Sequence, residues 1–174
     1  LFLSLALVAL GLLAWYYLPI HMVATETITT PGPLRVTLSQ KLGLLTVAGI
    51  IDETNRQRAL AKIPPLTHNT ALDKAAQKKA DDILARQYFD HVAPDGTGPA
   101  DVVQSVGYRY LRVGENLALG TFPDDATLIQ AWMDSPGHHA NILSTRFTEI
   151  GIGLVRGRFE SEEVWVAVQT FATP

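Results

Sequence analysis

The sequence predicts an α+β fold in which several helices precede an antiparallel β-hairpin. Two observations lead to this prediction. Between residues 47 and 143, apolar residues recur every three or four positions in several segments, which is the spacing of amphipathic helices. From residue 150 onwards they alternate with other residues, which is the spacing of strands with one buried face. The fold class therefore follows from a change of period along the chain.

Four segments carry the helical spacing: residues 47–62, Thr70 to Gln87, Pro99 to Val106, and a stretch from Asp124 or Asp125 that contains Trp132. Pro64 stops the first of them, and Gly107 ends the third. Thr70 is expected to be the N-cap of the second. A further helix is expected to begin at Pro136, with Ser135 as its N-cap. On the second segment, three lysines are expected to face solvent opposite the apolar stripe: Lys74, Lys78 and Lys79.

The hairpin is expected in the last part of the sequence. Its two strands show the apolar alternation at residues 150–155 and 164–169. The segment Arg156-Gly157-Arg158 lies between them and is interpreted as the turn region. The sequence contains no internal repeat, so one hydrophobic core is expected.

Composition excludes several classes of protein. The 174 residues include 14 lysines and arginines against 17 aspartates and glutamates, a net charge of −3. Nucleic-acid-binding domains usually carry a basic excess, so no nucleic-acid partner is expected. The absence of cysteine excludes a disulfide framework, a thiolate metal site and a cysteine nucleophile. The length suits one globular domain.

An apolar segment opens the sequence. Leu1 to Leu18 contains no charged residue, and aromatic residues follow one another near its end, as they do at a membrane interface. Residues 1–20 are therefore expected to be a single-pass anchor in the cell membrane, or an uncleaved signal, with the domain outside the cytoplasm. Residues 21–45, interrupted by Pro31-Gly32-Pro33, are expected to be a stalk that leads to a domain over residues 46–174.

Three side chains are candidate functional groups: His91, Glu115 and His138. His138 lies at the third position of the helix that begins at Pro136. The positive end of a helix dipole disfavours the imidazolium form there, and neutral imidazole is the form that binds a metal. Two histidines and a glutamate form a three-ligand zinc site with an open fourth position in several enzymes. Each side chain could equally be a hydrogen-bonded structural group.

Several short motifs follow one another along the domain: Asn55-Arg56, Pro65-Leu66, Tyr88-Phe89-x-His91 with Pro94-Asp95-Gly96, Gly114-Glu115-Asn116, Trp132-x-x-Ser135-Pro136-Gly137-His138, Asn141-Ile142-Leu143 and Glu149-Ile150-Gly151-Ile152-Gly153. Together they resemble the CAP superfamily of cysteine-rich secretory, antigen-five and pathogenesis-related proteins, also called the SCP domain, in its bacterial branch. The resemblance covers residues 47–171.

The resemblance implies an α-β-α sandwich with a small antiparallel sheet between helical layers. It also implies a solvent-open cavity lined by two histidines and two acidic residues, which in some members holds a divalent cation such as Zn²⁺. The histidines match His91 and His138, and the first acidic residue matches Glu115. The second acidic position is Ser135 here, and Asp134 lies one residue away, about 100° round a helix. The implied metal site is therefore incomplete.

Three functions remain open at this point. The favoured one is a non-catalytic, extracytoplasmic binding module whose groove takes a lipid, a glycan or a peptide. The alternative is a metal-dependent, protease-like hydrolase in which His91 and His138 hold the ion and Glu115 either ligates it or acts as general base. Ser135 is expected to cap its helix rather than act as a nucleophile. A scaffold with a buried polar network is the third.

Overall fold

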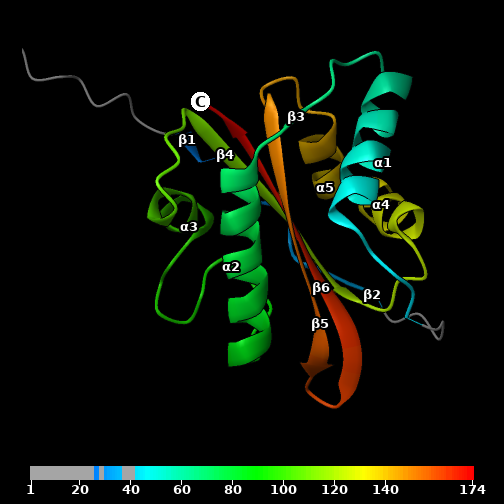
Figure 1. Ribbon diagram of the computed structural model, residues 1–174, viewed down its shortest axis with the longest axis vertical. Coiled ribbons are helices and arrows are strands. Elements are labelled where there is room, and N and C mark those ends of the chain that lie inside the picture. Colours follow the sequence, from blue (N-terminus) through cyan, green and yellow to red (C-terminus); the bar gives the residue numbers. More distant parts are fainter. Residues whose placement is uncertain (1–25, 28–29, 37–41) are drawn as a thin grey trace, which may run out of the picture.

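The computed structural model describes residues 26–27, 30–36 and 42–174. Within these ranges, six strands form one mixed sheet in the order β1-β4-β6-β5-β3, and β2 also pairs with β4 (Figure 1). The elements are, in chain order, β1 (Glu26–Thr27), β2 (Leu34–Val36), α1 (Val47–Leu60), β3 (Thr67–His68), α2 (Thr70–Arg86), α3 (Pro99–Ser105), β4 (Arg112–Gly120), α4 (Asp125–Met133), α5 (Pro136–Ile142), β5 (Glu149–Phe159) and β6 (Glu162–Thr173).

The helices confirm the expected segments, with one change in capping. α2 begins at Thr70, and the residue before it is the N-cap: the Asn69 side chain accepts a hydrogen bond from Ala71 N at 2.9 Å. Asparagine is as good an N-cap as serine or threonine. At the other end, Gln87 adopts a left-handed conformation with φ of 55° and terminates α2.

The predicted hairpin is confirmed as β5 and β6, but its turn was misplaced. Arg156-Gly157-Arg158 continues β5, with Gly157 paired to Val164, and the chain reverses only at Glu160, whose φ is 55°. Gly157 serves the packing of α2 instead of a turn. A Cβ atom added there would lie 2.6 Å from a methyl carbon of Leu84.

The third long strand, β4, was not predicted. Its residues from Val113 to Gly120 are all buried, so the alternation that identifies a half-exposed strand is missing. A continuous apolar or small-residue run cannot be assigned to strand or helix from periodicity alone. β4 pairs with β6 on one side, and β1 and β2 pair with its other edge in parallel.

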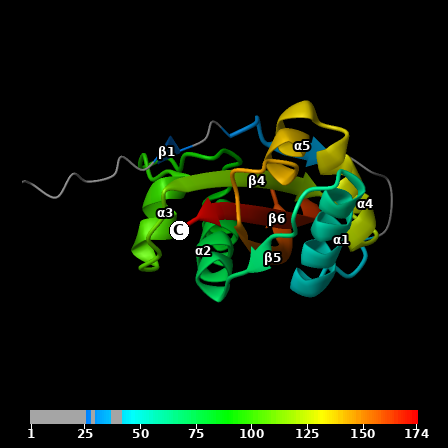
Figure 2. The same cartoon turned by 90° about the horizontal axis from the view of Figure 1, so that it is seen from above.

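Helices form a layer on each face of the sheet, as the predicted α-β-α architecture requires. Figure 1 and Figure 2 show α2 and α3 on one face, and α1, α4 and α5 on the other. Side chains of β6 alternate between them: Val166 and Val168 pack with α2, whereas Ala167 and Phe171 pack with α1 and α4. The sheet is mixed rather than antiparallel, because β1, β2 and β3 each pair in parallel with a long strand.

Glycines allow α2 to approach the sheet closely. A Cβ atom at Gly151 or Gly153 would lie 2.2 Å from a backbone carbon of Leu72 or Ala76, respectively. The helix backbone therefore rests against β5 with no side chain between them. This contact fixes the position of α2 and of the loop that follows it.

Part of the segment expected to be a stalk is packed on the domain. β1 and β2 both fall within residues 21–45, and Leu45 is buried. The expected membrane segment, residues 1–20, lies outside the described residues. Among the described residues, no helix combines the length and the apolar character that a membrane crossing requires.

We expect Gly153→Ala to lower the free energy of unfolding by about 3 kcal/mol, because the added methyl group must displace the backbone of α2. Gly32→Ala is the matched control, since an added Cβ there meets no atom within 4 Å. Its effect should stay below about 0.5 kcal/mol. Urea denaturation of both variants measures the difference, and equal stability would show that α2 does not rest directly on β5.

Candidate functional site

The three candidate residues lie on elements that adjoin β4 near its outer edge. β1 pairs there with Arg112 and Val113, and β2 pairs with residues 118–120. Glu115 lies on the stretch of β4 between these two pairings. His91 reaches it from the loop after α2, and the α5 backbone at His138 is tied to β4 by Asn116, whose side chain donates to the His138 carbonyl at 3.2 Å. The structure therefore brings His91 and Glu115 into contact and places the α5 backbone at His138 beside β4.

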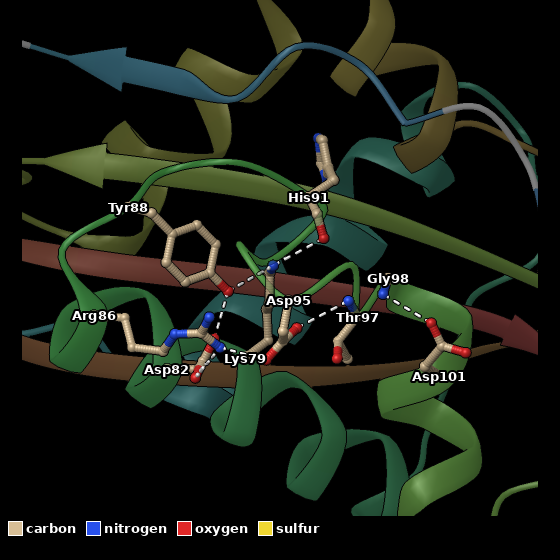
Figure 3. Close-up of polar contacts among 9 residues, drawn as sticks. All are labelled: Lys79, Asp82, Arg86, Tyr88, His91, Asp95, Thr97, Gly98 and Asp101. Atoms are coloured by element: carbon tan, nitrogen blue, oxygen red, sulfur yellow. Dashed lines mark hydrogen bonds and ion pairs between the residues drawn. The ribbon is translucent and has the colours of Figure 1, made fainter.

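The loop that carries His91 is held by a lysine of α2. Figure 3 shows Lys79 Nζ pointing from the helix into the loop, where it donates to the His91 carbonyl at 2.8 Å and contacts the Tyr88 hydroxyl at 3.0 Å. Tyr88 in turn donates to Asp82 at 2.6 Å. Lys79 thus fixes the backbone of the residue whose ring enters the site.

The prediction that Lys79 faces solvent was wrong. Its side chain is buried, because the His91 carbonyl and the Tyr88 hydroxyl satisfy its ammonium group inside the fold. Burial lowers the pKa of the Lys79 ammonium group, and the nearby negative charge of Glu115 opposes this shift. From the helical spacing, Lys79 was predicted to share the exposed face of Lys78, and of the two only Lys78 is exposed.

A turn stabilises the far side of this loop. Asp95 accepts hydrogen bonds from Thr97 N at 3.0 Å and from Arg86 at 2.7 Å, and both interactions hold the pKa of the Asp95 carboxyl below its usual range. Asp101 closes the loop onto α3 by accepting from Gly98 N at 2.8 Å (Figure 3). The motif Pro94-Asp95-Gly96 is therefore structural.

Both ring nitrogens of His91 face oxygen acceptors. Nδ1 lies 2.8 Å from Oε1 of Glu115, and Nε2 contacts the carbonyl oxygen of Pro31. Only the doubly protonated ring can donate from both nitrogens. His91 therefore links Glu115 of β4 to the backbone of the segment before β2.

His138 has one ring nitrogen with a partner and one without. Nδ1 lies 2.7 Å from Ser135 Oγ, whereas Nε2 is buried and has no hydrogen-bond partner within the described part of the chain. Burial, with a smaller contribution from the positive charge of His91, lowers the pKa of His138 to about 4. The ring is neutral near pH 7, so Nε2 can serve a ligand as a hydrogen-bonding group or as a metal donor.

Ser135 occupies the N-cap position of α5, as predicted, but its side chain does not cap the helix. The hydroxyl contacts the ring of His138 instead. This pair does not form a catalytic triad, because no carboxylate contacts the other ring nitrogen of His138 to orient it.

Buried amides connect the site to the opposite helical layer, and sequence analysis assigned them no role. Asn141 donates to Asn116 at 2.9 Å and to the Glu115 carbonyl at 3.2 Å. Asn116 donates to Gln169 at 3.0 Å, and Gln169 donates to Thr54 at 2.8 Å. Asn116 and Asn141 each belong to a motif noted above, which was the available signal.

The resemblance implied a solvent-open cavity at these residues, which stays a prediction. His91, Glu115 and His138 are 6%, 2% and 1% exposed, and the Pro31 carbonyl lies against the ring of His91. A pocket of about 440 Å³ opens beside this segment. Its lining includes Thr30, Pro31, Gly137 and Asn141.

The described residues do not fit the three-ligand metal site. Among them, no group of three His, Cys, Asp or Glu side chains could hold a metal ion. Glu115 is engaged by His91, and His91 Nε2 faces a carbonyl, so His138 Nε2 is the donor of this site that stays without a partner. Cation binding at these residues remains a prediction.

Residues 51–171 match the family model described as CAP, the cysteine-rich secretory protein family. Two relatives come from Bacillus subtilis (strain 168). The uncharacterized protein YkwD is 35% identical over 137 residues, covering 79% of this chain and 49% of YkwD. The uncharacterized membrane protein YlbC is 25% identical over 107 residues, covering 62% of this chain and 31% of YlbC. The chain thus spans half or less of these relatives.

Solved structures share the fold. An extracellular protein containing an SCP domain from Bacillus anthracis aligns with a TM-score of 0.65 and 26% identity, over 74% of this chain and 40% of that chain. An outer surface protein from Borrelia burgdorferi aligns with a TM-score of 0.62 and 21% identity, over 71% and 89% of the two chains. A cysteine-rich secretory protein from Staphylococcus aureus aligns with a TM-score of 0.60 and 20% identity, over 74% and 38%.

We expect the stability of the metal-free protein to fall as the pH drops from 6.5 to 4. The folded pKa of His138, about 4, lies below the unfolded value of 6.5, so the unfolded chain binds the extra proton in this window. The stabilisation by the neutral ring is fully present above pH 6.5. About 3 kcal/mol of the free energy of unfolding is lost as the pH falls through 4.

Chemical denaturation at several pH values measures this slope. His138→Gln should reduce it, whereas His139→Gln, on the same helix, leaves His138 in place and should preserve it. A slope that His138→Gln does not change would contradict the assignment of the buried neutral ring.

Proposed function

Because the chain belongs to the cysteine-rich secretory protein (CAP) family, we propose that it is a non-catalytic binding module that acts outside the cytoplasm. Its recognition site is the outer edge of β4 with His91, Glu115 and His138. One observation carries this proposal: a buried ring nitrogen of His138 has no hydrogen-bond partner among the residues that the structure describes.

A buried polar atom without a hydrogen bond costs about 1–3 kcal/mol, and native proteins contain few of them. His138 Nε2 retains this cost although Ser135 orients the ring and the amide network fixes its helix. A bound ligand that engages Nε2 would remove the cost. The atom therefore supports a binding role better than a purely structural one.

The extracytoplasmic location is supported by relatives. The Bacillus anthracis protein with this fold is extracellular, and the Borrelia burgdorferi protein is an outer surface protein. YlbC is named a membrane protein. We extend this to the present chain as a single-pass anchor formed by residues 1–20, which places the domain on the outer side of the cell membrane.

The arrangement of the carboxylate favours binding over hydrolysis. A metal-dependent hydrolase needs a carboxylate that is free to act as general base on a bound water. Glu115 is instead paired with His91 and only 2% exposed. A lipid, glycan or peptide, the ligand classes expected from the sequence, can bind without a free carboxylate, and a cation such as Zn²⁺ would then have a structural role.

If a cation takes part in this site, His138 Nε2 is its donor, and isothermal titration calorimetry of the full chain with Zn²⁺ tests this. His138→Gln should weaken binding at least about tenfold, which corresponds to about 1.4 kcal/mol, because the unpartnered nitrogen is the donor. His91→Gln tests whether the second ring takes part.

His139→Gln is the matched control, since it removes an imidazole from the same helix and should leave the affinity unchanged. If Zn²⁺ produces no heat, and the variants at His91 and His138 are merely less stable, the cation is removed from the proposal. That result would favour a scaffold held by a buried polar network.

A further inference from the structure

We propose that the outer edge of β4 is a docking site for an extended polypeptide segment, and that residues 30–36 of this chain are its resident occupant. The inference rests on the proposed function, because it names the class of ligand that the binding module takes. That ligand is a peptide with a proline before alternating apolar side chains, as in Pro31-Gly32-Pro33-Leu34-Arg35-Val36. It binds by adding a strand to a sheet edge.

The backbone pairing at this edge is short. β2 pairs with β4 over Leu34–Val36, and β1 adds Glu26–Thr27; these are the pairings of the described residues on this side of β4. An uncovered edge would expose unpaired N–H and C=O groups. Two parallel stretches of this length contribute few hydrogen bonds. The edge therefore requires a partner strand, and few backbone hydrogen bonds hold the resident one.

Two glycines leave room for a backbone beside the edge. A Cβ atom at Gly120, at the end of β4, would lie 2.2 Å from the carbonyl oxygen of Val36. A Cβ atom at Gly137, on α5, would lie 2.4 Å from Cβ of Pro31. The two glycines belong to different elements and face the same segment. A side chain at either position would overlap the resident segment, so both glycines are needed for its close approach.

Side chains of the resident segment alternate between core and surface. Leu34 and Val36 pack against the core beneath β4. Arg35 lies outside, with its guanidinium 5.0 Å from the ring centroid of Phe159 and 3.5 Å from Glu160. The groove therefore selects apolar residues at two positions and a cation between them, and such alternation gives specificity in strand addition.

A polar contact also binds the backbone of the resident segment, at Pro31. His91 Nε2 donates to the Pro31 carbonyl, and proline itself has no N–H to donate in return. The pocket of about 440 Å³ beside Thr30 and Pro31 leaves space for a larger side chain than the resident ones. The site thus combines one hydrogen bond to a carbonyl, two apolar contacts and an unfilled pocket.

The test uses a fluorescein-labelled peptide of residues 26–36 and fluorescence anisotropy on the full chain. In wild type the resident segment competes at an effective concentration of the order of millimolar, so the added peptide binds weakly. In the double variant Leu34→Ser/Val36→Ser the resident segment loses its apolar contacts. We expect this variant to bind the peptide at least about tenfold more tightly than wild type does.

Two controls define the groove. Adding Gly137→Leu to the double variant should abolish binding, because the new side chain occupies the place of Pro31. A peptide that carries serine at the positions of Leu34 and Val36 should not bind. If the double variant is folded by circular dichroism and binds the peptide no better than wild type, the inference is wrong, and residues 30–36 are a permanent part of the fold.

A second experiment covers the case in which the double variant does not fold. A protease site placed within residues 37–41 of the wild-type chain allows the resident segment to be cut from the domain. Exchange of the cut segment for the labelled peptide supports the inference, and its retention without exchange overturns it. The zinc titration and the peptide experiment test separate claims. Zinc binding without peptide exchange would overturn only the peptide-docking inference. Peptide exchange without zinc binding would remove only the cation from the proposed function.

Discussion

Glu115 places a carboxylate inside the sheet, and much of the surrounding structure follows from the need to neutralise it. A buried charge is tolerated only with a partner of opposite charge and with hydrogen bonds. His91 provides both, at 2.8 Å, and Lys79 adds a second positive charge nearby while it holds the His91 backbone. The loop after α2 must therefore lie against β4.

β4 also joins the two helical layers, because successive side chains of a strand point to opposite faces. Glu115 engages the loop after α2, whereas Asn116 engages α5 and, through Gln169, α1. Two adjacent residues thus fix three helical elements around one edge. The unpartnered nitrogen of His138 lies where these constraints converge. An immobilised, incompletely satisfied polar atom is typical of a recognition site prepared before its ligand arrives.

Periodicity was sufficient for the helices and the hairpin, and the order of motifs was sufficient for the family. Periodicity failed for β4, because complete burial removes the alternation of apolar and polar residues. It also failed for Lys79, because a group distant in the sequence satisfies this buried side chain. Gly157 shows a third cause of error. A glycine that makes room for a neighbouring side chain, here Leu84, cannot be distinguished in the sequence from a glycine that makes a turn. The contact of Pro31 with His91 joins residues 60 positions apart and has no local pattern at all.

β6 lies between β4 and β5 in the sheet, yet it follows both in the chain. Neither neighbour can complete its ladder before residues 162–173 have been synthesised. Folding therefore depends on contacts between distant segments, which form late and slowly compared with local ones. During translation, earlier elements emerge without the central strand that unites them. A polypeptide with this order of strands therefore cannot close its sheet until the whole domain has been made.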